Sequence, residues 1–325
     1  MIESFIDIML LSFLAVVAIA AVKIRDLFAV VMLFGIYSLL SAAIFVTLDA
    51  VDVAFTESAV GAGISTILIL STLALTAREE QKSQHKPFLP LLVVLVTGAT
   101  LVYGTLDMPG FGDADAPVHQ HVAPRYLQDS PQEVGPPNVV TSVLASYRGY
   151  DTMGEVMVIF TAGISVLILL TSVRHKRNEL GNLPDLQHHP ILLYVSRIFI
   201  PLILLFALYV QFHGDYGPGG GFQAGVIFAA GFILYGLIIG IDKTREVFTP
   251  KVLLRLAASG AILYIGVGML TLLLGGEFLN YNVLAANKLS GQHWGIFLVE
   301  LGVGITVTAT MISLFLTFSE VRRSQ

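Results

Sequence analysis

The sequence predicts an all-α membrane protein, a polytopic bundle of about nine transmembrane helices. Of its 325 residues, 55% are hydrophobic and only 13% are charged, and the mean hydropathy is +0.80. Soluble domains carry about 25% charged residues, so this much apolar surface fits a bilayer better than a soluble core. Several uninterrupted apolar stretches also reach the roughly 20 residues that a spanning helix needs.

The apolar stretches place the predicted spans in order along the chain, to within a few residues. They lie at about 4–22, 27–48, 54–77, 87–106, 153–173, 191–212, 220–241, 251–274 and 295–318. The first stretch lacks a basic leading segment and a small-residue cleavage site. We therefore expect a mature helix there and not a signal peptide.

Lysine and arginine residues set the expected orientation, because cytoplasmic loops are enriched in them. Alternate loops of the predicted topology hold nearly all of these residues. The basic set comprises Lys23, Arg25, Arg78, Lys82, Lys86, Arg174, Lys176, Arg177, Lys243, Arg245, Lys251, Arg255, Arg322 and Arg323, and the other set only Arg125, Arg148 and Lys288. This pattern predicts an N-terminus outside the cell and a cytoplasmic C-terminus.

Charged, polar linkers divide the chain into three predicted blocks: a three-helix block at 1–80, a two-helix block at 87–178 and a four-helix block at 188–325. The second block includes the longest loop, 107–138, which is acidic, rich in proline and expected on the outer side. We expect this loop to form an irregular cap without a core of its own. A short interfacial helix is expected to follow it at 139–146.

Ionisable groups inside a bilayer are costly, so each one is a candidate for function. Glu57, Glu155 and Glu300 lie near the outer ends of predicted spans three, five and nine, and His213 closes span six on the same side. Glu300 is expected about five residues into its span. This common depth, within roughly two turns of the interface, predicts a polar cluster or an outward-facing half-channel.

A purely structural interpretation of these carboxylates also stands. A carboxylate in the first turns of a helix can be solvated, or can be stabilised by the helix dipole. For His213 a structural hydrogen bond competes with proton transfer. Arg148 is expected to pair with Asp151 or Glu155, or to extend to the interface. Asp151 and Arg148 therefore join the candidate residues of the ion path.

The segment from His213 to Phe222 is a glycine-rich turn that opens the seventh span. Its members Gly217, Pro218, Gly219, Gly220 and Gly221 permit positive φ and close backbone approach. No Lys-Ser/Thr pair follows the glycines, so it is not a phosphate loop. We expect a tight structural turn, with Gly221-x-x-x-Gly225 and Gly236-x-x-x-Gly240 forming close helix contacts.

The residues that the chain lacks narrow the function further. It contains no cysteine, which excludes disulfides, cysteine-ligated iron–sulfur clusters and c-type haem attachment. We expect no cofactor, no metal site and no nucleic-acid partner. No lysine lies at mid-membrane, and the cytoplasmic halves of the spans are nearly without carboxylates. A self-contained pump would need such groups through the full thickness, so the chain is expected to complete a pathway with partner subunits.

These motifs resemble those of a known family. The segment 211–225 (QFHGDYGPGGGFQAG) and Glu300-Leu-Gly-Val-Gly304 look like the B subunit of Mrp-type multisubunit sodium/proton antiporters. The segment 52–63 (DVAFTESAVGAG) resembles the small module at the C-terminal part of the large Mrp A subunit, which also occurs in membrane-bound hydrogenases. The segment 147–155 (YRGYDTMGE) is similar to the adjoining module. The chain thus resembles a fusion of the tail modules of the A subunit with the B subunit, without the large antiporter-like portion.

The resemblance implies a subunit of a sodium/proton antiporter in the cell (inner or plasma) membrane, beside large antiporter-like subunits, in which Glu57 and Glu155 line the route with Glu300 and His213. It describes a secondary-transport component and no enzyme. Two alternatives remain: an ion-translocating membrane-arm subunit of a hydrogenase or another oxidoreductase related to respiratory complex I, and a non-conducting assembly scaffold.

Overall fold

The computed structural model describes residues 2–73, 76–81, 88–174 and 190–323. Within these residues the chain is helical, and its extended pairing is limited to one bridge between Asp26 and Glu79. The long helices are α1 (Ile2–Lys23), α2 (Leu27–Thr47), α5 (Phe88–Thr105), α10 (Gly149–Arg174), α11 (Pro190–His213), α12 (Gly221–Ile239), α14 (Pro250–Leu273) and α15 (Lys288–Arg323). One further long helix comprises α3 (Val51–Glu57), the π-helical stretch η1 (Ser58–Ser65) and α4 (Thr66–Leu73).

The prediction of an all-α bundle with nine spans is confirmed. In the described part of the chain, nine helices are long and apolar enough to cross a membrane. Eight of them begin within about four residues of the predicted start. Large apolar side chains are exposed along most of these helices, including Leu95 on α5 and Leu205 on α11. Such a surface is stable only against lipid or other apolar partners.

The start of the last span was predicted wrongly. Hydropathy placed it at 295, but α15 begins at Lys288. Most of the extra residues are polar or glycine, so the apolar stretch did not include them, and Gly291 and Gly295 lie close against Tyr281. Glu300 is consequently the thirteenth residue of α15, roughly 18 Å from its start at 1.5 Å per residue. The depth of Glu300 in the membrane, expected within one or two turns of the outer interface, stays a prediction.

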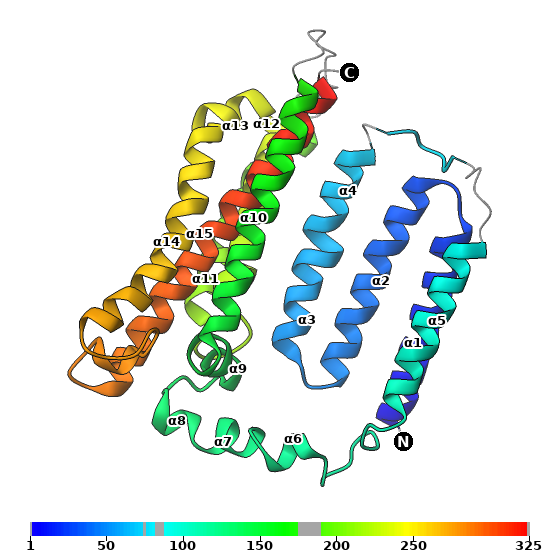
Figure 1. The fold of residues 1–325 in the computed structure, drawn as a ribbon. Coiled ribbons are helices and arrows are strands. Elements are labelled where there is room, and N and C mark those ends of the chain that lie inside the picture. Colours follow the sequence, from blue (N-terminus) through cyan, green and yellow to red (C-terminus); the bar gives the residue numbers. More distant parts are fainter. Residues whose placement is uncertain (1, 74–75, 82–87, 175–189, 324–325) are drawn as a thin grey trace.

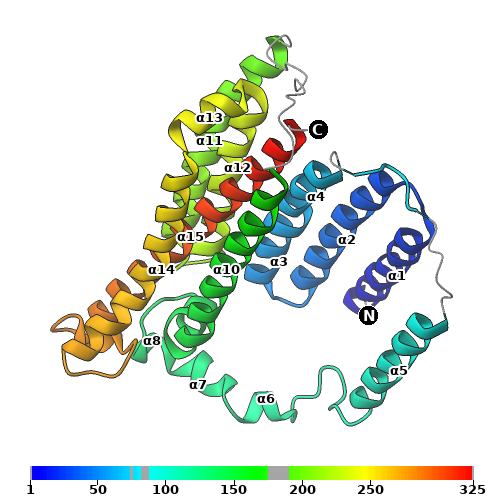
Figure 2. The ribbon, with the colours of Figure 1, turned by 45° about the horizontal axis from the view of Figure 1, so that its top comes forward.

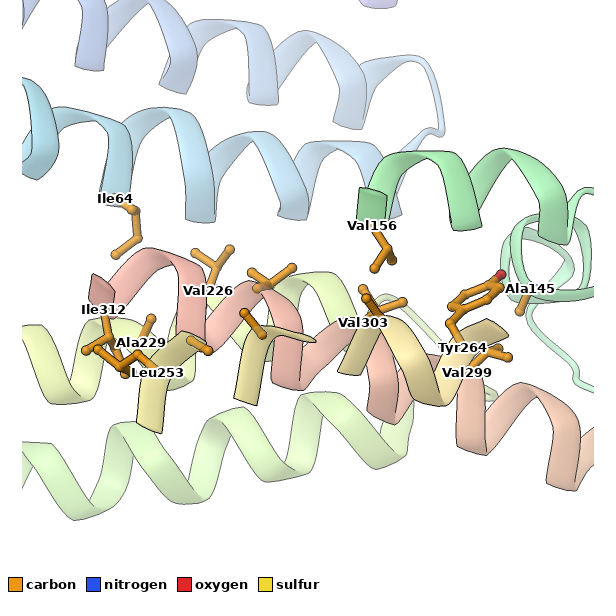
Figure 3. Close-up of a cluster of buried hydrophobic side chains, with 14 of the residues drawn as sticks. Ile64, Ala145, Val156, Val226, Ala229, Leu253, Tyr264, Val299, Val303 and Ile312 are labelled. Carbon is orange, nitrogen blue, oxygen red and sulfur yellow. The ribbon is translucent and has the colours of Figure 1, made fainter. Parts of the chain in front are cut away.

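The core lies where α10, α12, α14 and α15 meet (Figure 3), around fully buried side chains such as Tyr264, Val226 and Ile312. Glycines bring these helices together. A methyl group at Gly225 would lie 2.8 Å from the carbonyl oxygen of Gly304, and one at Gly221 would collide with the backbone of Glu300. The first predicted GxxxG contact is therefore confirmed. The second predicted pair, Gly236 and Gly240, does not lie within one helix, because Gly240 ends α12 with φ 121°.

The described parts of the predicted basic loops lie at one end of the bundle (Figure 1). Asp26, before α2, caps that helix and forms an ion pair with Arg78 at 3.0 Å. Backbone bonds from Leu27 to Arg78 and from Glu80 to Arg25 join the two segments. The same end holds α13 (Ile241–Val247) and the end of α15 (Figure 1). This arrangement is consistent with the alternation of loops, while the orientation in the membrane stays a prediction.

The segment 107–138 is less irregular than predicted. It contains three short helices, α6 (Pro117–Gln120), α7 (Ala123–Gln128) and α8 (Ser130–Glu133), each with proline in its first turn. Proline there has the fixed φ that a helix start needs. The segment runs along one end of the molecule from α5 to α9 (Val139–Thr141) (Figure 2). The helix predicted at 139–146 is confirmed as α9 and the π-helical turn η2 (Ser142–Tyr147).

Helix α5 overlaps α1 in the view of Figure 1, but Figure 2 shows it apart from the other helices. Its residues are exposed along nearly its whole length, and no part of its span is buried. Eleven residues separate it from α6, so it is held by its connections and not by packing.

Candidate functional site

A cavity of about 250 Å³ opens between helices from all three predicted blocks. Its apolar walls come mainly from α10, η2 and α15, and its polar groups come from five separate segments. The polar lining residues are Asp52, Thr56, Thr141, Thr152, Glu155, Gln223 and Glu300, together with the glycines at 219–221. A cleft with a few converging polar groups is the usual form of a small-ligand or ion site.

Helix α3 contributes Asp52 and Thr56 to the cavity. Asp52 lies in the first turn of this helix, where the dipole favours a negative charge. Its Oδ1 accepts hydrogen bonds from Asn138 Nδ2 at 3.3 Å and from the backbone N–H of Gly219 at 3.4 Å. Thr56 Oγ1 accepts a bond of 2.8 Å from Gln223 Nε2 on α12. These bonds join the first block to the glycine turn and the helix behind it.

The glycine-rich turn forms one wall, and its predicted tight packing is confirmed. The backbone N–H of Gly220 donates to the Val210 carbonyl at 3.1 Å, which closes the turn against the end of α11. Gly220 has φ 115°, a conformation that side chains disfavour. A methyl group at Gly219 would lie 2.6 Å from the same carbonyl oxygen. Larger residues could not form this turn without displacing α11.

Glu300 projects from α15 toward this turn. A methyl group at Gly220 would lie 3.3 Å from its Oε1, and one at Gly214 would lie 3.4 Å from its Oε2. The two glycines therefore leave room for the carboxyl and cover it. Among the described residues, Glu300 has no hydrogen bond or ion pair through its side chain. A half-buried carboxyl without a partner is costly, which suggests a role beyond stability.

Glu155 lines the same cavity from α10, but its side chain is exposed. The prediction that Arg148 pairs with an acidic neighbour is confirmed for Asp151, at 2.5 Å. Both members of that pair are exposed at the start of α10 and are not among the lining residues. Glu155 thus has no ionic partner within the described residues, and its charge faces the outside of this chain.

The other two candidates lie apart from the cavity lining. Glu57 ends α3 where η1 begins, beside Ser38 of α2, and a methyl group at Gly61 would lie 2.6 Å from its Oε1. His213 ends α11 and stacks on Tyr209 with ring centroids 4.8 Å apart. The structure therefore brings Glu155 and Glu300 together around one cavity, and places Glu57 and His213 beside it.

Three polar residues that shape the site were not predicted from the sequence: Asp52, Asn138 and Gln223. Asp52 precedes Glu57 by five residues, and Gln223 follows the glycine turn directly, so both were within motifs but carried no separate signal. Asn138 was counted only as the end of a loop. Asparagine is a common helix cap, so its position just before the predicted helix at 139–146 could have indicated a structural role for Asn138.

The carboxylates line the cavity without forming a metal centre. Among the described residues, no group of three or more His, Cys, Asp or Glu side chains is arranged to hold a metal ion. The three carboxyls of Asp52, Glu155 and Glu300, with neighbouring hydroxyl and amide groups, can instead accept and release protons, or bind a monovalent cation transiently through oxygen atoms.

Comparison with known protein families assigns every block a counterpart. Residues 191–313 match the model described as a domain related to the MnhB subunit of Na⁺/H⁺ antiporters. Residues 12–78 match the D subunit of MBH, and residues 90–188 match the E subunit of MBH.

Individual relatives agree with these matches. The chain is 31% identical over 132 residues to the protein named antiporter subunit mnhB2 of Staphylococcus haemolyticus, covering 40% of this chain and 93% of that protein. It is 26% identical over 248 residues to a protein of Rhizobium meliloti named as the A/B subunit of a K(+)/H(+) antiporter, covering 67% of this chain but only 24% of that protein.

Among solved structures, the Mrp complex from Dietzia sp. contains a chain with a TM-score of 0.74 and 27% identity, and the match covers 94% of this chain. This chain spans only 34% of the length of that one.

Proposed function

Since the chain belongs to the family of the MnhB subunit of Na⁺/H⁺ antiporters, we propose that it is a membrane subunit of a multisubunit monovalent cation/proton antiporter. In this proposal the cavity contributes carboxylates to the ion or proton path. Sodium is the proposed cation, and the complex resides in the cell membrane. The chain acts as a component of secondary transport and not as an enzyme.

The observation that carries this proposal is the meeting of Glu155 and Glu300 at one cavity. They belong to different predicted blocks, and hydrophobic packing alone does not require a carboxyl from each at the same place. Charged groups within spans are rare because they are costly, and they mark ion or proton pathways. Asp52, Thr56 and Thr141 add oxygen atoms along the same cavity.

Partner subunits complete the proposed path. The exposed side chain of Glu155 belongs to a predicted span, so lipid is an unfavourable neighbour for it. A partner helix or a water-filled space would remove this cost.

The test is cation-dependent proton flux in vesicles that contain the complete native complex. Glu155→Gln and Glu300→Gln keep the side-chain size and remove the charge, and each should lower flux about tenfold or more, as expected for loss of a proton-transfer group. Glu246→Gln is the matched control, because Glu246 is exposed on α13 at the other end of the bundle. Normal flux in both cavity variants, with normal subunit content, would refute the ion-path role and favour the assembly scaffold.

A second candidate is the ion-translocating membrane arm of a redox-driven complex. The matches of 12–78 and 90–188 to the two MBH subunits favour it. The two candidates differ in their partners. Purification of the native complex with subunit identification by mass spectrometry distinguishes them: large antiporter-like subunits alone support the antiporter, and hydrogenase or iron–sulfur subunits support the redox complex.

A further inference from the structure

Asn138 lies where the three blocks meet. It belongs to the second block, and its side-chain Nδ2 donates to Asp52 Oδ1 of the first block at 3.3 Å. The same nitrogen donates to the carbonyl oxygens of Gly214 at 3.2 Å and Gly217 at 3.0 Å, both in the glycine turn of the third block. Its backbone N–H donates to the Asp215 carbonyl at 3.0 Å. Few side chains in a bundle bond to so many separate segments.

Two neighbours strengthen this arrangement. Thr141 Oγ1 donates to the Gly214 carbonyl at 2.6 Å, so this oxygen accepts bonds from two side chains of the second block. Asp52 Oδ1 accepts both from Asn138 and from the backbone N–H of Gly219. The turn is therefore bonded at both of its ends, near Gly214 and near Gly219, by residues outside its own block.

The turn that these bonds hold is the one that covers Glu300. Gly214 and Gly220 of the turn lie beside the two carboxyl oxygens of Glu300. Because the turn consists largely of glycine, its backbone has little intrinsic preference for one conformation. Bonds from the first two blocks therefore add to the Gly220–Val210 bond that closes the turn within its own block.

We propose that Asn138 is a positioning residue that holds the glycine turn closed over Glu300, so that access to this carboxyl from the side of the turn depends on contact between all three blocks. This inference rests on the proposed function for its significance, because Glu300 is a proposed group of the ion path. Its geometry and its test do not require transport to be measured.

The test measures access to Glu300 directly. Membranes that contain the complete complex are treated with dicyclohexylcarbodiimide, a membrane-permeant reagent for protonated carboxyls, and labelling is quantified by peptide mass spectrometry. Glu57 is the internal control, because it lies beside Ser38 and Gly61 and not under the turn.

The principal variant is Asn138→Ser. Serine retains an oxygen that can cap α9 but removes the amide donors to Asp52, Gly214 and Gly217. We expect the rate of Glu300 labelling to rise roughly fivefold, the effect of losing about one net hydrogen bond from a closed state, with Glu57 labelling unchanged.

Thr141→Val removes one donor to Gly214 and should give a smaller rise. Asn287→Ala is the control. Asn287 also caps a helix, but that helix is α15, and Asn287 is distant from the turn in sequence.

An unchanged rate for Glu300 in both variants would overturn the inference. An equal rise at Glu300 and Glu57 would also overturn it, because it would indicate general loosening. If Asn138→Ser prevents assembly, Thr141→Val alone decides by the same criterion. Unchanged Glu300 labelling in Asn138→Ser and Thr141→Val, together with abolished flux in Glu300→Gln, would leave the proposed function intact while this inference fails.

Discussion

Glu155 and Glu300 carry the same chemical group in different surroundings. Glu300 lies under glycines and is half-buried, whereas Glu155 is exposed on α10. Glu300 is covered by the turn on one side and lines the cavity on the other, so it exchanges protons through the cavity or when the turn opens. An exposed carboxyl exchanges with whatever lies beside this chain in the complex. The two residues are therefore suited to different steps, Glu300 within this chain and Glu155 at its boundary with a partner.

Unlike these two residues, Glu133 at the end of α8 is a carboxylate with a structural role. It accepts a hydrogen bond from the Tyr147 hydroxyl and pairs with Arg125 at 3.2 Å. The Tyr147 hydrogen bond, followed by Arg125, holds the pKa of the Glu133 carboxyl below its ordinary value. Burial, with Glu133 beside it, raises the pKa of Tyr147 to about 12, so the phenol stays a donor at neutral pH.

The lowered pKa of Glu133 gives a pH prediction. Its stabilisation of the α7–α8 segment is fully present above the unfolded pKa of about 4.3 and is lost as pH falls through the lowered folded value. Proteolysis of residues 123–134 in the complex, by a protease that is active at both neutral and acid pH, should accelerate in that window. Glu133→Gln should be cleaved faster already at neutral pH and should gain little on acidification. Asp129→Asn, also exposed, is the control, and identical pH profiles for all three proteins would exclude this role.

Between helices, the fold depends on close approach at glycines. Helix α12 meets α15 at Gly221 and Gly225, and α14 meets α15 at Gly260 and Gly302. In lipid the hydrophobic effect does not drive helices together, so small residues that allow backbone contact take a large share of the stabilisation. This explains why α15 is the most buried span and why α1 and α5, without such contacts, bury none of their length.

Gly221 offers a test of this packing. Gly221→Leu places a side chain against the backbone of Glu300 and should destabilise the protein by about 1–3 kcal/mol, the usual cost of overpacking. The measurement is the thermal midpoint and the subunit content of the purified complex. Gly266→Leu on α14 is the control, because a methyl group there meets nothing within 4 Å. Equal effects of the two substitutions would count against glycine-mediated contact.

Taken as a whole, the bundle has two chemically different ends. One holds the basic loops and α13, and the other holds the acidic segment 107–138. The orientation predicted from lysine and arginine places the acidic end outside the cell.

The absence of native cysteine allows a direct test of this orientation. In Ala114→Cys, a membrane-impermeant thiol reagent should label the complex in intact cells. In Glu246→Cys, labelling should require permeabilised cells. Both positions are exposed, so access in the folded protein is matched. The reverse pattern would invert the topology.

The chain is also expected to be inactive by itself. The predicted spans lack a mid-membrane lysine and have few carboxylates in their cytoplasmic halves. Purified protein reconstituted in vesicles with an imposed pH gradient should show no cation-dependent proton flux above empty vesicles. Strong flux from this chain alone would contradict the dependence on partners. The complete complex, reconstituted in the same lipid, serves as the positive control.

The membrane class, the nine spans and the alternation of their ends could all be predicted from the amino-acid sequence. These properties depend on local hydropathy and on the position of lysine and arginine, which a chain carries wherever its helices pack. The glycine turn was also predictable, because such a run of glycines has few other uses. The start of α15 was beyond local hydropathy, since Gly291 and Gly295 are made helical by packing against residues 281–285.

Which polar groups meet depends on tertiary packing and could not be predicted. Glu155 and Glu300 were equivalent in sequence to Glu57 and His213, and the packing of α3, α10, α12 and α15 placed the first two at one cavity and the others beside it. Asp52 and Asn138 lie 86 residues apart and bond to each other. The physical reason is that hydropathy fixes how deep a residue lies along a helix, whereas side-chain packing between distant segments fixes which face it presents and to what.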